Sequence, residues 1–179
     1  LPIAIKYDGT APKDTHGFQA HVGPMSSDSR GFVHAKSSDP RLAPAIQFNY
    51  LSTAKDRREW VEAIKKTREI FAQPAFDELR GEELQPGVDA VSDEAILEFV
   101  AQCGESAYHP SCTCPMGTGE NAVVDESLSA QGLGGLRVVD ASVMPTITNG
   151  NLNAPTIMIA EKAADMILGN SPLAPANTP

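Results

Sequence analysis

The sequence predicts an α+β fold in which an antiparallel sheet carries helices and is followed by short strands and a long apolar helix. Three observations predict it. Stretches that alternate apolar and polar residues occupy the first fifty positions, which is typical of strands with one buried face. Between residues 52 and 103, apolar residues recur at helical spacing. From residue 155 to 168 the chain is apolar nearly all round a helix, which predicts burial against a sheet.

The first half is expected to build most of the sheet and two helices. Strands are predicted at 1–7, 17–22, 32–36 and 45–50, separated by turn residues. Ser52 or Thr53 can cap a helix that reaches about residue 72, with Trp60 in its core face, and Pro74 ends it. Ser92 begins a second helix that ends near Gly104. The intervening loop, 81–91, includes Glu83 and is expected to be solvated.

The second half is expected to hold short strands at 121–125 and 135–140 before the helix at 155–168. Asn153 stands at the N-cap position, because an asparagine side chain accepts hydrogen bonds from the first helical N–H groups. Pro155 is tolerated in the first turn, where its missing N–H had no partner.

Composition excludes several classes of function. The 179 residues are 41% hydrophobic and 21% charged, as in a soluble globular domain, and the net charge of −9 leaves no basic surface for a nucleic acid. The longest apolar stretch contains three charged residues and is too short to span a bilayer. With no signal peptide at its start, we expect a cytoplasmic protein, and attachment to the inner face of the membrane stays open. The chain opens in a strand-like segment at Leu1 and is expected to be a fragment.

The cysteines do not suggest a metal site. Cys103, Cys112 and Cys114 are odd in number, and the last two are separated by one residue. A structural zinc site needs two to four residues between paired cysteines and a second pair elsewhere. We therefore expect no bound metal and three buried, small hydrophobic side chains.

Two polar positions are candidates for proton chemistry. His109 precedes Pro110, which favours an extended backbone from which an imidazole can reach a cleft and act as a general base. A structural histidine bonded to a backbone carbonyl is the alternative. Asn151 and Asn153 stand where the last helix begins, and a helix N-terminus favours negative charge. A simple turn and cap is the alternative there.

Three ordered motifs resemble the C-terminal region of the glucose–methanol–choline oxidoreductase family. They are Tyr-His-Pro-Ser-Cys-Thr-Cys-Pro-Met-Gly at 108–117, Val-Val-Asp-Ala-Ser-Val-Met-Pro at 138–145, and Gly-Asn-Leu-Asn-Ala-Pro-Thr-Ile-Met-Ile-Ala-Glu-Lys at 150–162. Matches in the first half, such as His-Gly-Phe-Gln-Ala-His-Val-Gly at 16–23, resemble the bacterial choline dehydrogenase branch. The resemblance covers about residues 1–170.

The resemblance implies part of an FAD-dependent enzyme that oxidises choline to betaine aldehyde, toward glycine betaine. Residues 1–105 would belong to a substrate-binding domain, 106–170 to the last segment of a Rossmann-like FAD-binding domain, and 171–179 to a flexible tail. His109 would take the hydroxyl proton while hydride passes to flavin N5, and Asn153 would orient the oxygen.

The resemblance also implies where the cofactor would lie. Residues that would contact the flavin are Asp140, Ala141, Asn151, Pro155 and Thr156. This sequence contains no G-x-G-x-x-G loop, so most of the FAD site is expected in a part of the protein outside it, and the chain alone is expected to be inactive.

Two alternatives remain open at this point. One is a dehydrogenase of the same family for uncharged primary alcohols, since Pro115 stands where choline dehydrogenases commonly have a basic residue. No carboxylate or aromatic group for a trimethylammonium head is identifiable either. The other is a non-enzymatic binding module that retains the fold. The electron acceptor, oxygen or a respiratory chain, is also left open.

Overall fold

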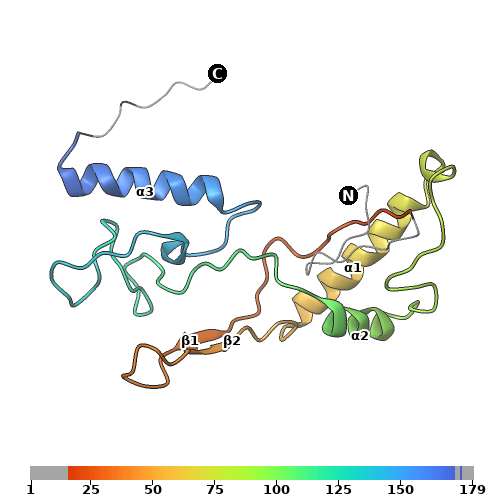
Figure 1. Cartoon of the computed structure of the whole chain (residues 1–179), viewed down its shortest axis with the longest axis horizontal. Helices are drawn as coiled ribbons and strands as arrows, with labels where there is room; N and C mark the ends of the chain where they lie inside the picture. The colour runs from red at the N-terminus through yellow and green to blue at the C-terminus, as the bar shows by residue number, and fades with distance from the viewer. Residues whose placement is uncertain (1–15, 172–173, 175–179) are drawn as a thin grey trace. The chain divides into compact units, whose positions relative to one another are not determined.

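The computed structural model describes residues 16–171 and 174, and within them the fold is α+β, with three α-helices and a two-stranded antiparallel sheet (Figure 1). These residues form two compact units. The first contains 16–31 and 47–105, and the second contains 32–46 with the remainder from 106 onward. The predicted strand at 1–7 and most of the predicted tail at 171–179 lie outside the described residues.

Two capped helices form the framework of the first unit, and both predictions are confirmed. Helix α1 spans Ala54–Phe71 and helix α2 spans Asp93–Cys103. The hydroxyl of Thr53 accepts the N–H of Asp56 at 3.1 Å, and the hydroxyl of Ser92 accepts the N–H of Ala95 at 3.2 Å. Each cap satisfies a donor that the helix itself leaves free.

A small apolar core joins the two helices. Its buried members are Val61 and Ile64 of α1 with Ile96 and Val100 of α2. Trp60, predicted to be a core residue, is only partly buried at the edge of this cluster.

Arg68 fixes the loop that connects the helices. Its guanidinium donates to both carboxylate oxygens of Glu83 at 2.8–3.1 Å and to the backbone carbonyls of Gly87 and Ala90 at 3.0 and 2.8 Å. The planar guanidinium can satisfy several acceptors at once. The prediction that Glu83 is solvated was therefore wrong, because this side chain is half-buried in the ion pair.

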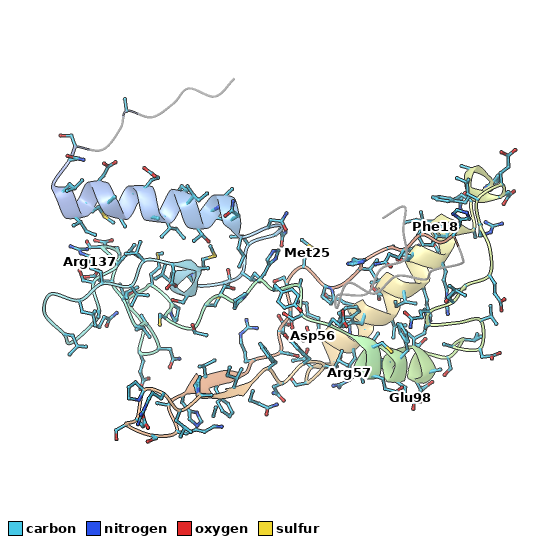
Figure 2. The ribbon with its side chains drawn as sticks, in the orientation of Figure 1. Phe18, Met25, Asp56, Arg57, Glu98 and Arg137 are labelled. Carbon is cyan, nitrogen blue, oxygen red and sulfur yellow. The ribbon has the colours of Figure 1, made fainter. Side chains whose placement is uncertain are left out.

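Asp56, in the first turn of α1, is the one charged side chain buried among the described residues (Figure 2). Its carboxylate accepts the backbone N–H groups of Asp28 and Ser29, both at 2.8 Å, and the hydroxyls of Ser27, at 2.6 Å, and Ser29. Burial by itself raises the pKa of Asp56, but these hydrogen bonds to the charged form outweigh burial and hold the pKa well below its usual range. The turn at 27–29 is thereby tied to the start of α1.

The strands predicted at 32–36 and 45–50 are correct in place but shorter than predicted. Strands β1, Phe32–His34, and β2, Ala45–Gln47, form a hairpin. The predicted strand at 17–22 is wrong, because that stretch has no regular structure and the ring of Phe18 packs on Phe71 and Phe76 instead. The predicted buried face is also wrong, since β1 is exposed throughout. Two strands alone cannot bury a face.

Helix α3, Asn153–Leu168, lies along irregular loops in the second unit (Figure 1). The predicted strands at 121–125 and 135–140 are wrong, and only isolated bridges occur there. Val124 pairs with Met116 and Ala130, and Arg137 pairs with Ser129, one residue at a time, so no ladder long enough for a strand forms.

The second unit has its own small core. Its buried residues are Val124, Leu128, Val143 and Ala163. The prediction that α3 is buried was wrong for the described chain, since Ala163 alone in this helix is buried and apolar side chains elsewhere on it are exposed. Gly169 ends the helix in the left-handed region with φ 71°, as its position predicts.

Replacing Asp56 by asparagine should destabilise the first unit. An asparagine keeps one acceptor oxygen and turns an NH₂ group toward donors, and each buried unsatisfied group costs about 1–3 kcal/mol. We expect Asp56→Asn to lower the free energy of unfolding by roughly that amount, measured by urea denaturation with the fluorescence of Trp60. Asp77→Asn, which changes an exposed carboxylate paired with Arg80, is the matched control and should change little.

The same variant predicts a pH dependence. The folded-state pKa of Asp56 is lowered, so its stabilisation is complete above the unfolded-state pKa of about 4 and is lost as pH falls through the folded-state value. The wild-type chain should therefore lose stability below about pH 4, with a steeper slope than Asp56→Asn. If the free energy of unfolding fell equally with pH in the wild type and in Asp56→Asn, Asp56 would not be the group responsible for the loss.

Candidate functional site

The segment that carries His109 runs beside η2, the 3₁₀ helix Ala141–Val143. Three backbone N–H groups of the segment donate to three consecutive carbonyls of η2. The pairs are Cys112 with Ala141 at 3.3 Å, Cys114 with Ser142 at 2.9 Å, and Met116 with Val143 at 2.9 Å. Two of the three sequence motifs are therefore neighbours in the fold.

The backbone on both sides of His109 adopts an uncommon conformation. Tyr108 and Cys112 have φ angles of 56° and 67°, in the left-handed region that residues with side chains rarely enter. Such residues cost about 1–3 kcal/mol each and concentrate at functional sites. The side chain of His109 itself is half-buried. The unusual backbone beside it makes His109 a candidate for a functional side chain.

The prediction that all three cysteines are buried was wrong. Cys103 is exposed, and Cys112 and Cys114 are half-buried free thiols. Their segment is held by backbone hydrogen bonds to η2 and not by burial of sulfur. Over residues 16–171 and 174, no group of three or more His, Cys, Asp or Glu side chains is placed to hold a metal ion.

Helix α3 begins one residue earlier than its predicted cap allows. Asn153 is the first helical residue and Leu152 is the N-cap, so the predicted capping role of Asn153 is wrong. Thr156 donates its N–H, at 3.0 Å, and its hydroxyl, at 2.7 Å, to the carbonyl of Leu152. Pro155 has no N–H to offer.

This helix end therefore has no side-chain cap among the described residues. The first N–H groups of α3 and the exposed amides of Asn151 and Asn153 are donors around the positive end of the helix dipole. Donors of this kind fit a phosphate, an alkoxide or an electron-rich ring. The residues present would thus fit one edge of a flavin.

Asp140 has a role that the sequence motif does not reveal. Its Oδ1 accepts the N–H of Ser142 at 2.8 Å and makes Asp140 the N-cap of η2. The side chain of Asp140 is otherwise exposed, and Ala141 is half-buried. An Asp side chain commonly accepts the backbone N–H two residues further on, so an Asp directly before this turn could have suggested the bond.

All seven candidate residues lie in the second unit, but the structure does not join all of them. Asp140 and Ala141 are brought beside the segment of His109, whereas Asn151, Asn153, Pro155 and Thr156 gather at the start of α3. In the described part of the chain, no hydrogen bond links His109 with Asn153.

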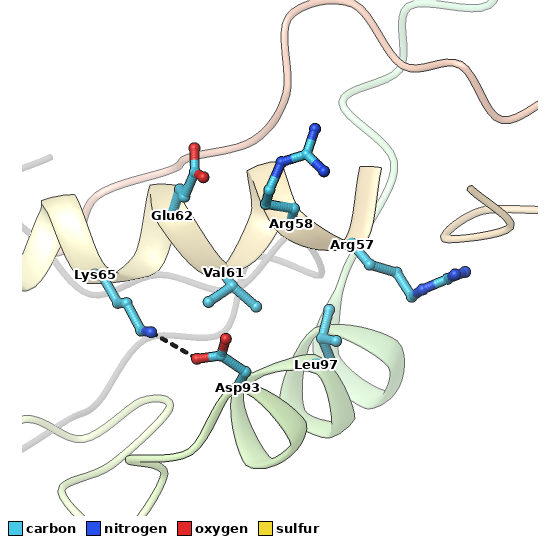
Figure 3. Close-up of a pocket in the computed structure, with 7 residues that line it drawn as sticks. All are labelled: Arg57, Arg58, Val61, Glu62, Lys65, Asp93 and Leu97. Atoms are coloured by element: carbon cyan, nitrogen blue, oxygen red, sulfur yellow. Dashed lines mark hydrogen bonds and ion pairs between the residues drawn. The ribbon is translucent and has the colours of Figure 1, made fainter. Parts of the chain in front are cut away.

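The first unit has a shallow groove between α1 and α2 (Figure 3). It is lined by Arg57, Arg58, Val61, Glu62, Lys65, Asp93 and Leu97. An exposed ion pair between Lys65 and Asp93, 2.5 Å long, crosses it. The groove contains none of the candidate residues. It is the surface depression between two packed helices, lined mostly by charged side chains.

Comparison with known proteins identifies the family. The family model described as GMC oxidoreductase matches residues 27–160, which is most of the chain. The chain therefore belongs to the GMC oxidoreductase family.

Among its relatives are proteins named oxygen-dependent choline dehydrogenase. The one from Photobacterium profundum is 57% identical over 181 residues, covering 100% of this chain and 32% of that protein. The one from Pseudomonas syringae pv. tomato is 59% identical over 173 residues, covering 97% and 30%. The chain thus spans about a third of the length of these relatives.

Solved structures agree with this assignment. Pyridoxine 4-oxidase from Mesorbium loti matches with a TM-score of 0.77 and 32% identity over 83% of this chain and 29% of its own. An FAD-dependent oxidoreductase from Chaetomium thermophilum matches with a TM-score of 0.76 and 30% identity over 81% and 25%. Among the described residues, no helix has both the length and the apolarity needed to cross a membrane.

Enlarging Ala163 should loosen the second unit. This residue is 1% exposed and packs in the cluster with Val143, so Ala163→Leu overfills the core and should cost about 1–3 kcal/mol. Hydrogen exchange of the α3 amides measures the loss. Ala164→Leu, at the neighbouring exposed position, is the control. Equal exchange rates in the two variants would show that Ala163 does not anchor α3.

Proposed function

We propose that this chain is the C-terminal part of a longer FAD-dependent dehydrogenase that oxidises choline to betaine aldehyde, toward glycine betaine. The observation that carries the proposal is the 57% identity, along the whole chain, to a relative named oxygen-dependent choline dehydrogenase. That name also makes oxygen the electron acceptor to test first. The cytoplasmic location, with or without attachment to a membrane face, stays a prediction.

Residues 1–105 are assigned to a substrate-binding domain and 106–170 to the final segment of the FAD-binding domain. The division between the compact units after Glu105 supports this boundary. The hairpin at 32–46 associates with the later residues and is the exception. Because the chain lacks a G-x-G-x-x-G loop, we assign most of the FAD site to the remainder of the protein and expect the chain alone to be inactive.

In this proposal His109 is the general base. Its imidazole takes the proton from the substrate hydroxyl, and the resulting negative charge on oxygen makes the adjacent carbon a good hydride donor. The side-chain amide of Asn153 donates a hydrogen bond to the same oxygen and stabilises that charge. FAD, when bound, supplies the acceptor for the hydride.

The uncapped start of α3 supports a cofactor contact there. Its free donors and the helix dipole favour negative charge. We assign the contact to Asn151, Pro155 and Thr156, and assign Asp140 and Ala141 to the same cofactor from the neighbouring motif. Each of these residues would orient the flavin or polarise its ring, while the redox chemistry belongs to the flavin.

An enzyme for uncharged primary alcohols is the second candidate. It is favoured by the structural likeness to an aryl-alcohol oxidase, at a TM-score of 0.71 and 32% identity. We rank it lower because the identity to proteins named choline dehydrogenase is much higher and extends along the whole chain.

Replacing His109 by alanine in the full-length protein should lower kcat with choline by about 100- to 10,000-fold, the usual contribution of a general base. Flavin content, read from the visible absorbance of the purified protein, should be unchanged. The matched control is His34→Ala, on the exposed strand β1. Full turnover of His109→Ala would contradict the assigned base and favour a non-enzymatic module.

Flavin bleaching under anaerobic conditions distinguishes the substrates. We expect choline to bleach the flavin of the full-length protein, because choline loses its hydroxyl proton and transfers a hydride that reduces the flavin. 3,3-Dimethylbutan-1-ol has the shape of choline without its charge and is the matched comparison. Bleaching by the neutral alcohol alone would retain the family chemistry and exclude choline. Bleaching by neither alcohol, with flavin bound, would favour the binding module.

A further inference from the structure

The 3₁₀ helix η2 contacts both parts of the candidate site. Its three carbonyls accept hydrogen bonds from the segment that follows His109. Its last side chain, Val143, is fully buried and packs in one cluster with Ala163 of α3, the helix that begins at Asn153. The position of η2 therefore determines how the His109 segment and α3 stand with respect to each other within the second unit.

A three-residue helix has little stability of its own. Inside η2 and its boundaries, backbone bonds run from Val143 to Asp140 at 3.2 Å and from Met144 to Ala141 at 3.3 Å, both long. The shorter bond is the cap, 2.8 Å from the N–H of Ser142 to the carboxylate of Asp140. A hydrogen bond to a charged acceptor is stronger than one to a carbonyl. The cap is thus a principal bond that fixes the start of η2.

We propose that Asp140 is a positioning residue for the alcohol oxidation. Its carboxylate caps η2, and η2 holds the His109 segment in register against α3. This inference rests on the proposed function and deepens it, because it assigns the carboxylate an action through the N–H of Ser142. A displacement of about 1 Å at a reacting group can lower turnover about 100-fold, so a loose η2 should be costly.

Asp140→Ala and Asp140→Asn in the full-length protein separate the cap from the charge. Alanine removes the acceptor, whereas asparagine keeps an acceptor oxygen at the same distance from the backbone and removes the charge. Asp125→Ala is the matched control. That carboxylate accepts the N–H groups of Ser127 and Ser129, both at 2.9 Å, and caps a turn of the same unit that is not η2.

Two measurements are made on each protein. Hydrogen exchange of the peptide spanning 112–116 reports the bonds to η2 directly and needs no turnover. Flavin content shows whether the candidate site still holds the cofactor, and the separate values of kcat and KM with choline show whether turnover or binding has changed. Asp140→Ser, a shorter and weaker cap, provides an intermediate step if the alanine variant does not fold.

For Asp140→Ala we expect at least about tenfold faster exchange in 112–116 and a roughly 30- to 100-fold lower kcat, with less change in KM. Asp140→Asn should restore most of the protection from exchange and raise kcat at least about tenfold above that of Asp140→Ala. Asp140→Ser should fall between these two variants. Asp125→Ala should change exchange in 112–116 much less than Asp140→Ala, because the residues before its turn, Val123 and Val124, bond to Pro115 and Gly117 and not to the N–H groups that η2 accepts.

Unchanged exchange in 112–116 for Asp140→Ala would overturn the inference. So would an asparagine variant as impaired as alanine, which would assign the role to the charge. If the wild-type protein oxidises neither choline nor a neutral alcohol, the proposed function fails, and the exchange measurement still decides whether Asp140 holds η2.

Discussion

The buried carboxylate of Asp56 is the interaction on which the first unit depends. It gathers four donors from the turn at 27–29 onto the start of α1, in a unit whose apolar core contains only a few side chains. A buried charge is tolerated when hydrogen bonds satisfy it, and leaving it unsatisfied is expensive. At the other end of α1, Arg68 donates hydrogen bonds to carbonyls of the loop 81–91. Polar groups therefore fix both the turn and the loop in a unit with little apolar burial.

Polar tethers of the same kind recur in the second unit. Asp140 caps η2, Asp125 caps the turn before Ser129, and the start of α3 is held by bonds to the carbonyl of Leu152. In each case a short side chain satisfies nearby backbone groups, which is the local chemistry that irregular loops require. The candidate functional residues sit on these tethered loops, where a framework of helices and small cores positions them.

Local signals in the sequence were sufficient for the helices. Thr53, Ser92 and Gly169 mark helix ends through bonds and backbone angles that involve only nearby residues. The strands were predicted less well, because a strand exists only if a distant segment pairs with it. At 17–22 no such partner is present among the described residues, and at 135–140 the pairing is limited to an isolated bridge between Arg137 and Ser129. The motif of His109 could be recognised from its residues, but its pairing with η2 depends on contacts between segments far apart in the chain.

The pairing between the His109 segment and η2 also constrains chain length more than side-chain identity. Alternate residues of the segment donate to consecutive carbonyls, so each step along η2 uses two residues of the segment. A single residue inserted or deleted between Cys112 and Met116 would therefore take some of these N–H groups away from their carbonyls and shift His109 along η2. Many substitutions there would leave the register intact, because the bonds are made by the backbone.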